Sequence, residues 1–152
     1  LKSQGASNPL LKSEGQELWK LGCEFVQGAS GIAAVRDDRL LYYARLQAIA
    51  ALRNYSKRSN TPLSSEMVNL FEWSSRGLET ADGRNAFIKF EPTASRKAIV
   101  TGFDPFFLNE QPEISNPSGL IALDFNNNPS KNFGTASSPA VVRTAVFPVR
   151  FR

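Results

Sequence analysis

Two phenylalanines that flank an Asp-Pro pair carry the clearest potential for binding chemistry in this sequence. Phe103 and Phe106 stand three residues apart in the run GFDPF. Gly102 permits a tight exit from a preceding strand, and the Asp-Pro pair stiffens the turn between the rings. Two rings held in this way could form an apolar slot for a small flat group, with little ordering entropy lost on binding. The alternative is that both rings cap the core at a strand end, and the residues alone leave both interpretations open.

Nucleophilic catalysis is limited by the composition. The chain contains one cysteine and no histidine, so a Cys-His or Ser-His pair cannot be assembled from these residues alone. A histidine-ligated metal site is excluded for the same reason. Cys23 follows Trp19 by four positions on a predicted helix, which indicates a buried packing thiol rather than a nucleophile. We therefore expect no catalytic residue, no metal and no cofactor in this chain, and an enzyme would take its essential groups from elsewhere.

Helical patterns occupy the first part of the chain, residues 1–80. Apolar residues at helical spacing predict three helices, over 13–28, 38–57 and 62–77. The third is expected to begin with Thr61 as N-cap and Pro62 in the first position. The second carries apolar residues around much of its circumference, which indicates burial on more than one side. We expect this three-helix extension to act as a scaffold or docking unit.

Strand patterns take over in residues 81–152. Residues with high β-propensity predict three strands, over 86–90, 96–103 and 140–151. The middle strand contains a continuous apolar run, which is typical of a central strand covered on both faces. Asn116 is predicted to cap a short helix that has Pro117 in its first position, and residues 125–139 are predicted to form a loop. The order of strand, helix and strand predicts one right-handed βαβ unit.

A single βαβ unit is small for an independent domain. Two strands and one crossover helix bury too little surface to complete an α/β fold. We therefore expect further polypeptide to complete the sheet, either the rest of the same polypeptide, a cleaved second chain or a partner subunit, and a homo-oligomer is left open. Ligands of open α/β sheets bind at the carboxyl ends of the strands, which is where the loop that contains Phe103 and Phe106 begins.

Composition narrows the function classes. The chain has 152 residues, of which 41% are hydrophobic and 21% charged, as in a globular protein. The net charge of +4 is spread without a dense basic run, so nucleic acid is not an expected partner. No apolar stretch reaches the roughly 18 residues that suggest a membrane span, and no membrane partner is expected. The predicted location is the cytoplasm.

The run VTGFDPF and the later NPS, residues 100–106 and 116–118, resemble the N-terminal signature of the pyroglutamyl peptidase I family, the pyrrolidone-carboxylate peptidases. In that family the first strand ends in Thr-Gly-Phe-(Asp/Glu)-Pro-Phe, and Asn-Pro-Ser opens the first helix. The run VFPVRF near the end of the chain is similar to the family's second strand. Residues 1–95 have no counterpart. The family also has glycine where this chain has Phe107, and a shorter segment before Asn116.

The resemblance implies an enzyme of which this chain is one part. It implies the N-terminal half of an α/β/α sandwich, in a cysteine peptidase that removes an N-terminal pyroglutamyl or related residue from peptides. Phe103 and Phe106 would hold the lactam ring, with Gly102 and Asn116 in the same substrate-binding site. The family's catalytic Cys, His and Glu would lie downstream of this chain. One alternative is a non-catalytic interaction module with the peptidase fold, whose helices dock a partner. Another is a helical effector module fused to a degenerate peptidase fold.

Overall fold

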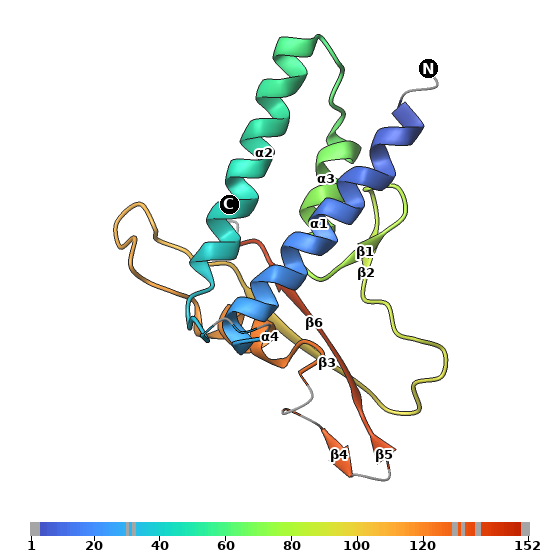
Figure 1. Cartoon of the computed structure of the whole chain (residues 1–152), viewed down its shortest axis with the longest axis vertical. Helices are drawn as coiled ribbons and strands as arrows, with labels where there is room; N and C mark the ends of the chain where they lie inside the picture. Colours follow the sequence, from blue (N-terminus) through green and yellow to red (C-terminus); the bar gives the residue numbers. More distant parts are fainter. Residues whose placement is uncertain are drawn as a thin grey trace.

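The computed structural model describes residues 4–29, 31, 33–128, 131, 133–135 and 138–149. Along these residues the helices are α1 (Gln4–Gln27), α2 (Arg39–Ser59), α3 (Ser65–Ser74) and α4 (Pro117–Phe125). The strands are β1 (Glu79–Thr80), β2 (Ala86–Phe87), β3 (Lys97–Phe103), β4 (Gly134–Thr135), β5 (Ser138–Pro139) and β6 (Val141–Phe147). The protein is mixed α/β (Figure 1), which confirms the coarse fold class.

The first helix is longer than its apolar pattern predicts. It begins at Gln4 rather than near residue 13 and continues through Pro9. Leu11, which precedes the predicted start, is buried with Leu70 and Phe71 of α3. Packing of Leu11 against α3 therefore supports helix before residue 13, because burial of an apolar face stabilises a helix more than local propensity does.

The predicted start of α3 is wrong by several residues. Ser64, not Thr61, is the N-cap, and its Oγ accepts a hydrogen bond from the Met67 amide at 3.2 Å. Thr61 belongs to the end of α2 instead, where its amide donates to the Ser56 carbonyl. Both residues are competent caps, so the choice between them depends on where α2 ends, at Asn60 in a left-handed conformation.

Helix α2 is buried along one narrow stripe only. Leu41, Arg45 and Ile49, spaced four residues apart, are its buried residues. Leu46, which the apolar pattern places toward the interior, is 45% exposed. The prediction of burial on more than one side is therefore wrong, and the central residue of the buried stripe is a charged one.

The predicted order of strand, helix and strand is confirmed, whereas the right-handed crossover stays a prediction. Strands β3 and β6 pair in parallel, from Lys97 with Val141 to Phe103 with Phe147, and α4 is the crossover helix between them. Asn116 is the N-cap of α4, where its side chain accepts from the Ser118 amide. Strand β6 stops at Phe147, before Pro148, which has no amide hydrogen to donate.

Two predictions about the smaller strands are wrong. The strand expected over 86–90 contains only the two exposed residues of β2, which pair with β1. The loop expected over 125–139 contains the short antiparallel pair of β4 and β5. Short hairpin ladders of this kind have too few residues for a periodic pattern to appear in the sequence.

One face of the β3–β6 pair carries the core. Val146 packs with Trp19, Cys23 and Val26 of α1, and with Ala122 and Leu123 of α4. Figure 1 shows α4 close to the C-terminal end of α1. Residues before and after position 80 therefore share one core, whereas the division of the chain at that position into two domains stays a prediction.

The other face of β3 is open among the described residues. Its side chains alternate between partly buried and exposed as far as Thr101. Ile99 is 56% exposed and Phe103 is 52% exposed. The prediction that this strand is covered on both faces is therefore wrong for the part of the chain that the structure describes. None of the described helices is both long and apolar enough to cross a bilayer.

Candidate ligand-binding site

The loop that follows β3 is anchored by a buried carboxylate. The Asp104 side chain is held by two guanidinium groups: Arg45 Nη1 lies 2.9 Å from Oδ1, and Arg76 Nη1 lies 2.6 Å from Oδ2. All three side chains are at most 5% exposed. We call these three residues the arginine–aspartate cluster. It connects α2, the segment after α3 and the loop after β3, which are far apart in the sequence.

Hydrogen bonds of the main chain hold the same loop in place. The Asp104 amide donates to the Phe147 carbonyl at 2.9 Å. The Asp104 carbonyl accepts from Asn116 Nδ2 at 3.1 Å. The side chain and both main-chain polar groups of Asp104 are therefore paired, and the start of the loop is rigid.

Arg45 is fully committed to this structural role. Its Nε donates to Ser75 Oγ and its Nη2 to the Ser75 carbonyl, both at 3.0 Å. Burial lowers the pKa of Arg45 to about 10, with a further lowering by the charge of Arg76 and an opposing effect of Asp104. Arg45 still carries its charge at neutral pH, because that pKa lies well above 7.

Three exposed phenylalanines surround the end of β3. Phe103, Phe106 and Phe107 are 52%, 39% and 49% exposed. The rings of Phe106 and Phe107 meet edge to face, with centroids 5.2 Å apart. Together with Asn116 and Val149 these rings line a cavity of about 310 Å³, which we call the aromatic pocket. The structure thus brings together Phe103, Phe106 and Asn116 of the four residues predicted to bind substrate.

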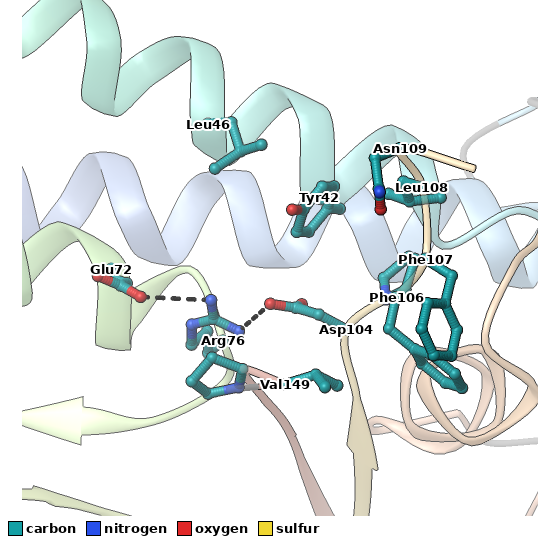
Figure 2. A pocket seen from close by; sticks show the side chains of 12 residues that line it. Tyr42, Leu46, Glu72, Arg76, Asp104, Phe106, Phe107, Leu108, Asn109 and Val149 are labelled. Atoms are coloured by element: carbon teal, nitrogen blue, oxygen red, sulfur yellow. Dashed lines mark hydrogen bonds and ion pairs between the residues drawn. The ribbon is translucent and has the colours of Figure 1, made fainter. Parts of the chain in front are cut away.

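A larger cavity of about 430 Å³ adjoins the aromatic pocket and shares Phe106, Phe107 and Val149 with it. Its other lining residues come from α2, α3, the loop after β3 and the segments that follow α3 and β6: Tyr42, Leu46, Glu72, Arg76, Asp104, Pro105, Leu108, Asn109 and Pro148. Figure 2 shows Glu72, Arg76 and Asp104 in a row, with the two phenylalanine rings beyond Asp104. The two cavities therefore place aromatic surface next to buried charge.

Gly102 and Asn116 lie beside the aromatic pocket, where β3 meets the start of α4. A Cβ atom on Gly102 would lie 2.2 Å from the Ser118 carbonyl oxygen, so only glycine allows β3 to approach the start of α4 this closely. Asn116 uses its side-chain oxygen to accept from the Ser118 amide and hydroxyl, at 3.0 and 2.8 Å. Its side-chain nitrogen is bonded to the loop carbonyl described above. Their assignment to substrate binding stays a prediction.

Phe107 has an unusual backbone conformation. Its φ is +59°, in the left-handed region that glycine adopts freely and bulky residues adopt at a cost. Strained residues of this kind cluster at functional sites. The turn that follows Phe106 therefore holds an aromatic ring at a position where the backbone geometry favours glycine.

A further buried carboxylate, that of Asp38, contacts the end of the loop at Asn116. It lies at the start of α2, and its two oxygens accept from the Asn116 amide at 3.1 and 3.2 Å. Burial raises the pKa of Asp38 to about 6, and the hydrogen bond from Asn116 opposes that change. Asp38 was predicted only as a helix start, and its contact with Asn116 joins positions that are distant in the sequence.

Cys23 has the environment of a packing residue. It is 4% exposed, and Asn126 Nδ2 donates to its sulfur at 3.5 Å. Burial raises the pKa of the Cys23 thiol to about 12, so the reactive thiolate is scarce at neutral pH. The prediction of a buried structural thiol is confirmed. No group of three or more acidic, cysteine or histidine side chains that could hold a metal occurs among the described residues.

The arginine–aspartate cluster was missed by the sequence interpretation. The available signal was Arg45, a charged residue midway between Leu41 and Ile49 in the apolar stripe of α2. A charge at such a position is almost always paired. Its partners could not be identified, because Arg76 and Asp104 approach it only through the tertiary fold.

The fold and the site together define a mixed α/β module with an aromatic pocket on an ion-anchored loop. Comparison with known families matches residues 1–72 to the family described as the PA0049 N-terminal domain. The chain is also 30% identical, over 128 residues, to the uncharacterized protein PA0049 of Pseudomonas aeruginosa strain PAO1. That similarity covers 75% of this chain and 23% of the relative, so the chain spans about a quarter of the relative's length. No solved structure shows a significant match.

The resemblance to the pyroglutamyl peptidase I family is therefore wrong. The comparisons relate the chain to a distinct family, and the match covers the helical residues for which the peptidase resemblance offered no counterpart. The short motif that suggested the peptidases has a local explanation. Gly102 is required by its approach to Ser118, and Asn116 with Pro117 forms a common helix start.

Proposed function

We propose that this chain is a non-catalytic binding module, which holds a small flat apolar group of a peptide in the aromatic pocket. The observation that carries this proposal is the gathering of three exposed phenylalanine rings around one cavity. Soluble proteins rarely leave such a group of rings exposed without a partner. The position at the carboxyl end of β3 is the usual ligand position in open α/β sheets.

The anchoring of the loop supports the same proposal. Asp104 is fixed through its side chain and its main chain, so Phe103 and Phe106 are presented by a rigid segment. A preorganised pocket loses little conformational entropy on binding. Covering a half-exposed ring contributes roughly 1 kcal/mol, so the three rings together support a Kd on the order of 10 mM for a small aromatic fragment.

The binding proposal does not require catalysis. The chain has no histidine, and its one cysteine is a buried thiol of high pKa. Peptide cleavage by a longer protein that contains this module stays a prediction, and the pyroglutamyl specificity has no support from the comparisons. The cytoplasmic location also stays a prediction.

We also propose that further polypeptide covers the open face of β3 and continues the sheet toward an α/β/α sandwich. Parallel strands are almost always buried on both faces, whereas Ile99 and Phe103 are more than half exposed. A seven-residue strand without proline, such as β3, is also a template for strand addition. The proposal fails if an Ile99→Cys variant is alkylated as fast in a longer protein that contains this chain as in the 152 residues alone, because covering polypeptide should protect that side chain.

Binding can be tested by titrating the ¹⁵N-labelled chain with 3-phenylpropionamide, a neutral probe with one flat ring. Amide shifts are expected at Phe103, Asp104, Phe106 and Phe107. Phe103→Ala or Phe106→Ala should weaken binding by about fivefold, as expected when part of a ring contact is lost. Phe87→Ala removes a ring of similar exposure on β2 and serves as the matched control. Shifts scattered over the surface, or equal Kd values in all three variants, would exclude the aromatic pocket.

A further inference from the structure

The two arginines of the arginine–aspartate cluster differ in how completely their donors are used. Arg45 pairs all three of its nitrogens at 2.9–3.0 Å. Arg76 makes one short bond, from Nη1 to Asp104, and its Nε has no hydrogen-bond partner among the described residues. Its Nη2 has a longer contact of 3.3 Å with Glu72. Arg76 Nη1 has a second, long contact of 3.4 Å with the Val146 carbonyl. Each guanidinium therefore makes three hydrogen bonds with its five N–H donors, but only Arg76 has a buried nitrogen, Nε, without a partner among the described residues, and two of its three bonds are long.

Arg76 and Glu72 both lie on the wall of the larger cavity. The side chain of Arg76 is 5% exposed, whereas that of Glu72 is 20% exposed. In Figure 2 Glu72 lies on one side of the Arg76 guanidinium and Asp104 on the other. Glu72 is thus the more accessible of the two carboxylates, and its contact with Arg76 is the longer one.

The charge balance of this region indicates what could replace Glu72. Two buried guanidinium groups face two carboxylates, Asp104 and Glu72. A ligand carboxylate that took the place of Glu72 would preserve the balance, and Glu72 could turn toward water. A neutral ligand would leave the existing pairs as they are. Carboxylates are the group that a guanidinium binds best, through paired N–H donors.

We propose that Arg76 recognises a carboxylate on the ligand, which displaces Glu72 while the apolar part of the ligand lies against Phe106 and Phe107. This inference rests on the proposed binding function and names the chemical class of its ligand, an apolar carboxylic acid. The acid is either a free small molecule or the C-terminus of a peptide. Asp104 stays in place, because both of its oxygens are held by the buried guanidinium groups.

The test compares two probes that differ only in charge, 3-phenylpropionate and 3-phenylpropionamide, by the same NMR titration of the full chain. The carboxylate should bind the wild-type chain about fivefold more tightly than the amide, as expected for a partly exposed ion pair. Glu72→Gln should tighten carboxylate binding by about a further fivefold and leave amide binding unchanged. Glu66→Gln removes a carboxylate from α3 that does not contact Arg76 and is the matched control.

The outcomes separate the two proposals. If both probes bind at the aromatic pocket with equal Kd values in the wild-type chain and in Glu72→Gln, the role of Arg76 is excluded and the binding function stands. If neither probe binds there, the binding function itself is excluded. Arg76→Lys should reduce the preference for the carboxylate, and Glu72→Gln decides the question if Arg76→Lys does not fold.

Two peptides identify the source of the carboxylate. Gly-Gly-Phe with a free C-terminus and the same peptide with an amidated C-terminus are titrated in parallel. Preference for the free peptide equal to that for 3-phenylpropionate supports a peptide C-terminus. A preference limited to 3-phenylpropionate supports a free small acid. The absence of a preference in both pairs of probes overturns the inference.

Discussion

Arg45 Nη1 donates to Asp104 Oδ1 at 2.9 Å, although 59 positions separate the two residues in the sequence. The pair joins the middle of α2 to the first residue of the loop that carries the aromatic pocket. Asp104 is shared with Arg76, so one carboxylate lies between two buried cations. The helical part of the chain therefore determines the position of the loop as much as the strand before it does.

Removal of Arg45 should destabilise the whole fold. Arg45→Met leaves Asp104 buried with one guanidinium partner, and we expect the free energy of unfolding to fall by about 3–5 kcal/mol. Arg53→Met, which removes an exposed arginine from the same helix, should change it by less than about 0.5 kcal/mol. Urea denaturation of both variants measures the difference. A similar small effect of both substitutions would show that the buried pair is not a stabilising link.

Asp38 should make stability depend on pH in a defined window. Its pKa in the fold is about 6, above the ordinary aspartate value of 3.8, so the folded chain binds a proton more strongly than the unfolded chain does. Stability from this group is therefore present below about pH 4, falls as the pH rises to about 6 and is constant above that. The decline should amount to up to about 3 kcal/mol, because the pKa rises from 3.8 to about 6 on folding.

Asp38→Asn should abolish this decline, because asparagine can accept from the Asn116 amide without titrating. The free energy of unfolding is measured by urea denaturation between pH 4 and pH 7. Hydrogen bonding to Arg39 lowers the pKa of Asp37, so its contribution is lost only at more acidic pH. Glu113→Gln, at an exposed position of the loop between β3 and α4, should retain the wild-type profile. An unchanged slope in Asp38→Asn would contradict the assignment.

Phe107 allows backbone strain to be separated from loss of the ring. Both Phe107→Asn and Phe107→Val remove the ring that meets Phe106. Asparagine tolerates a positive φ, whereas a β-branched residue does not. We therefore expect the valine variant to be less stable than the asparagine variant by about 1–2 kcal/mol. Thermal unfolding of the two proteins measures the difference, and equal stability would argue against a left-handed conformation at this position.

Cys23 should be inert in the folded chain. Its pKa of about 12 and its burial predict no alkylation by iodoacetamide at pH 7.5 within an hour. The unfolded chain in urea should react completely under the same conditions. Mass spectrometry reports the modified fraction in both states. Rapid alkylation of the folded chain would require a reactive thiolate and would reopen a chemical role for this residue.

Local signals in the sequence were sufficient for the βαβ unit and for the start of α4. Asn116 and Pro117 carry their structural meaning in their own chemistry, as an N-cap and a first helical residue. The position of α3 could not be predicted in the same way. Two competent caps, Thr61 and Ser64, lie close together, and the end of α2 decides between them.

The short motif around Phe103 and Phe106 correctly marked a cluster of rings at a strand end, and it misled in the choice of family. A motif of this length is compatible with more than one family, because glycine, Asp-Pro and Asn-Pro-Ser each answer a local steric need. The family match instead lies in the helical residues 1–72, where no short motif with a chemical meaning occurs.

By itself the sequence determined that three helices precede one βαβ unit, that no histidine chemistry is available, and that two phenylalanines flank a stiff turn. These properties depend on residue type and on neighbours within a few positions. Only the tertiary structure decided that Asp104 lies between Arg45 and Arg76, that Asp38 accepts a hydrogen bond from the Asn116 amide, and that one face of β3 is open among the described residues. Such pairings depend on distances between remote segments, and the energy of a buried charge is defined only once its surroundings are in place.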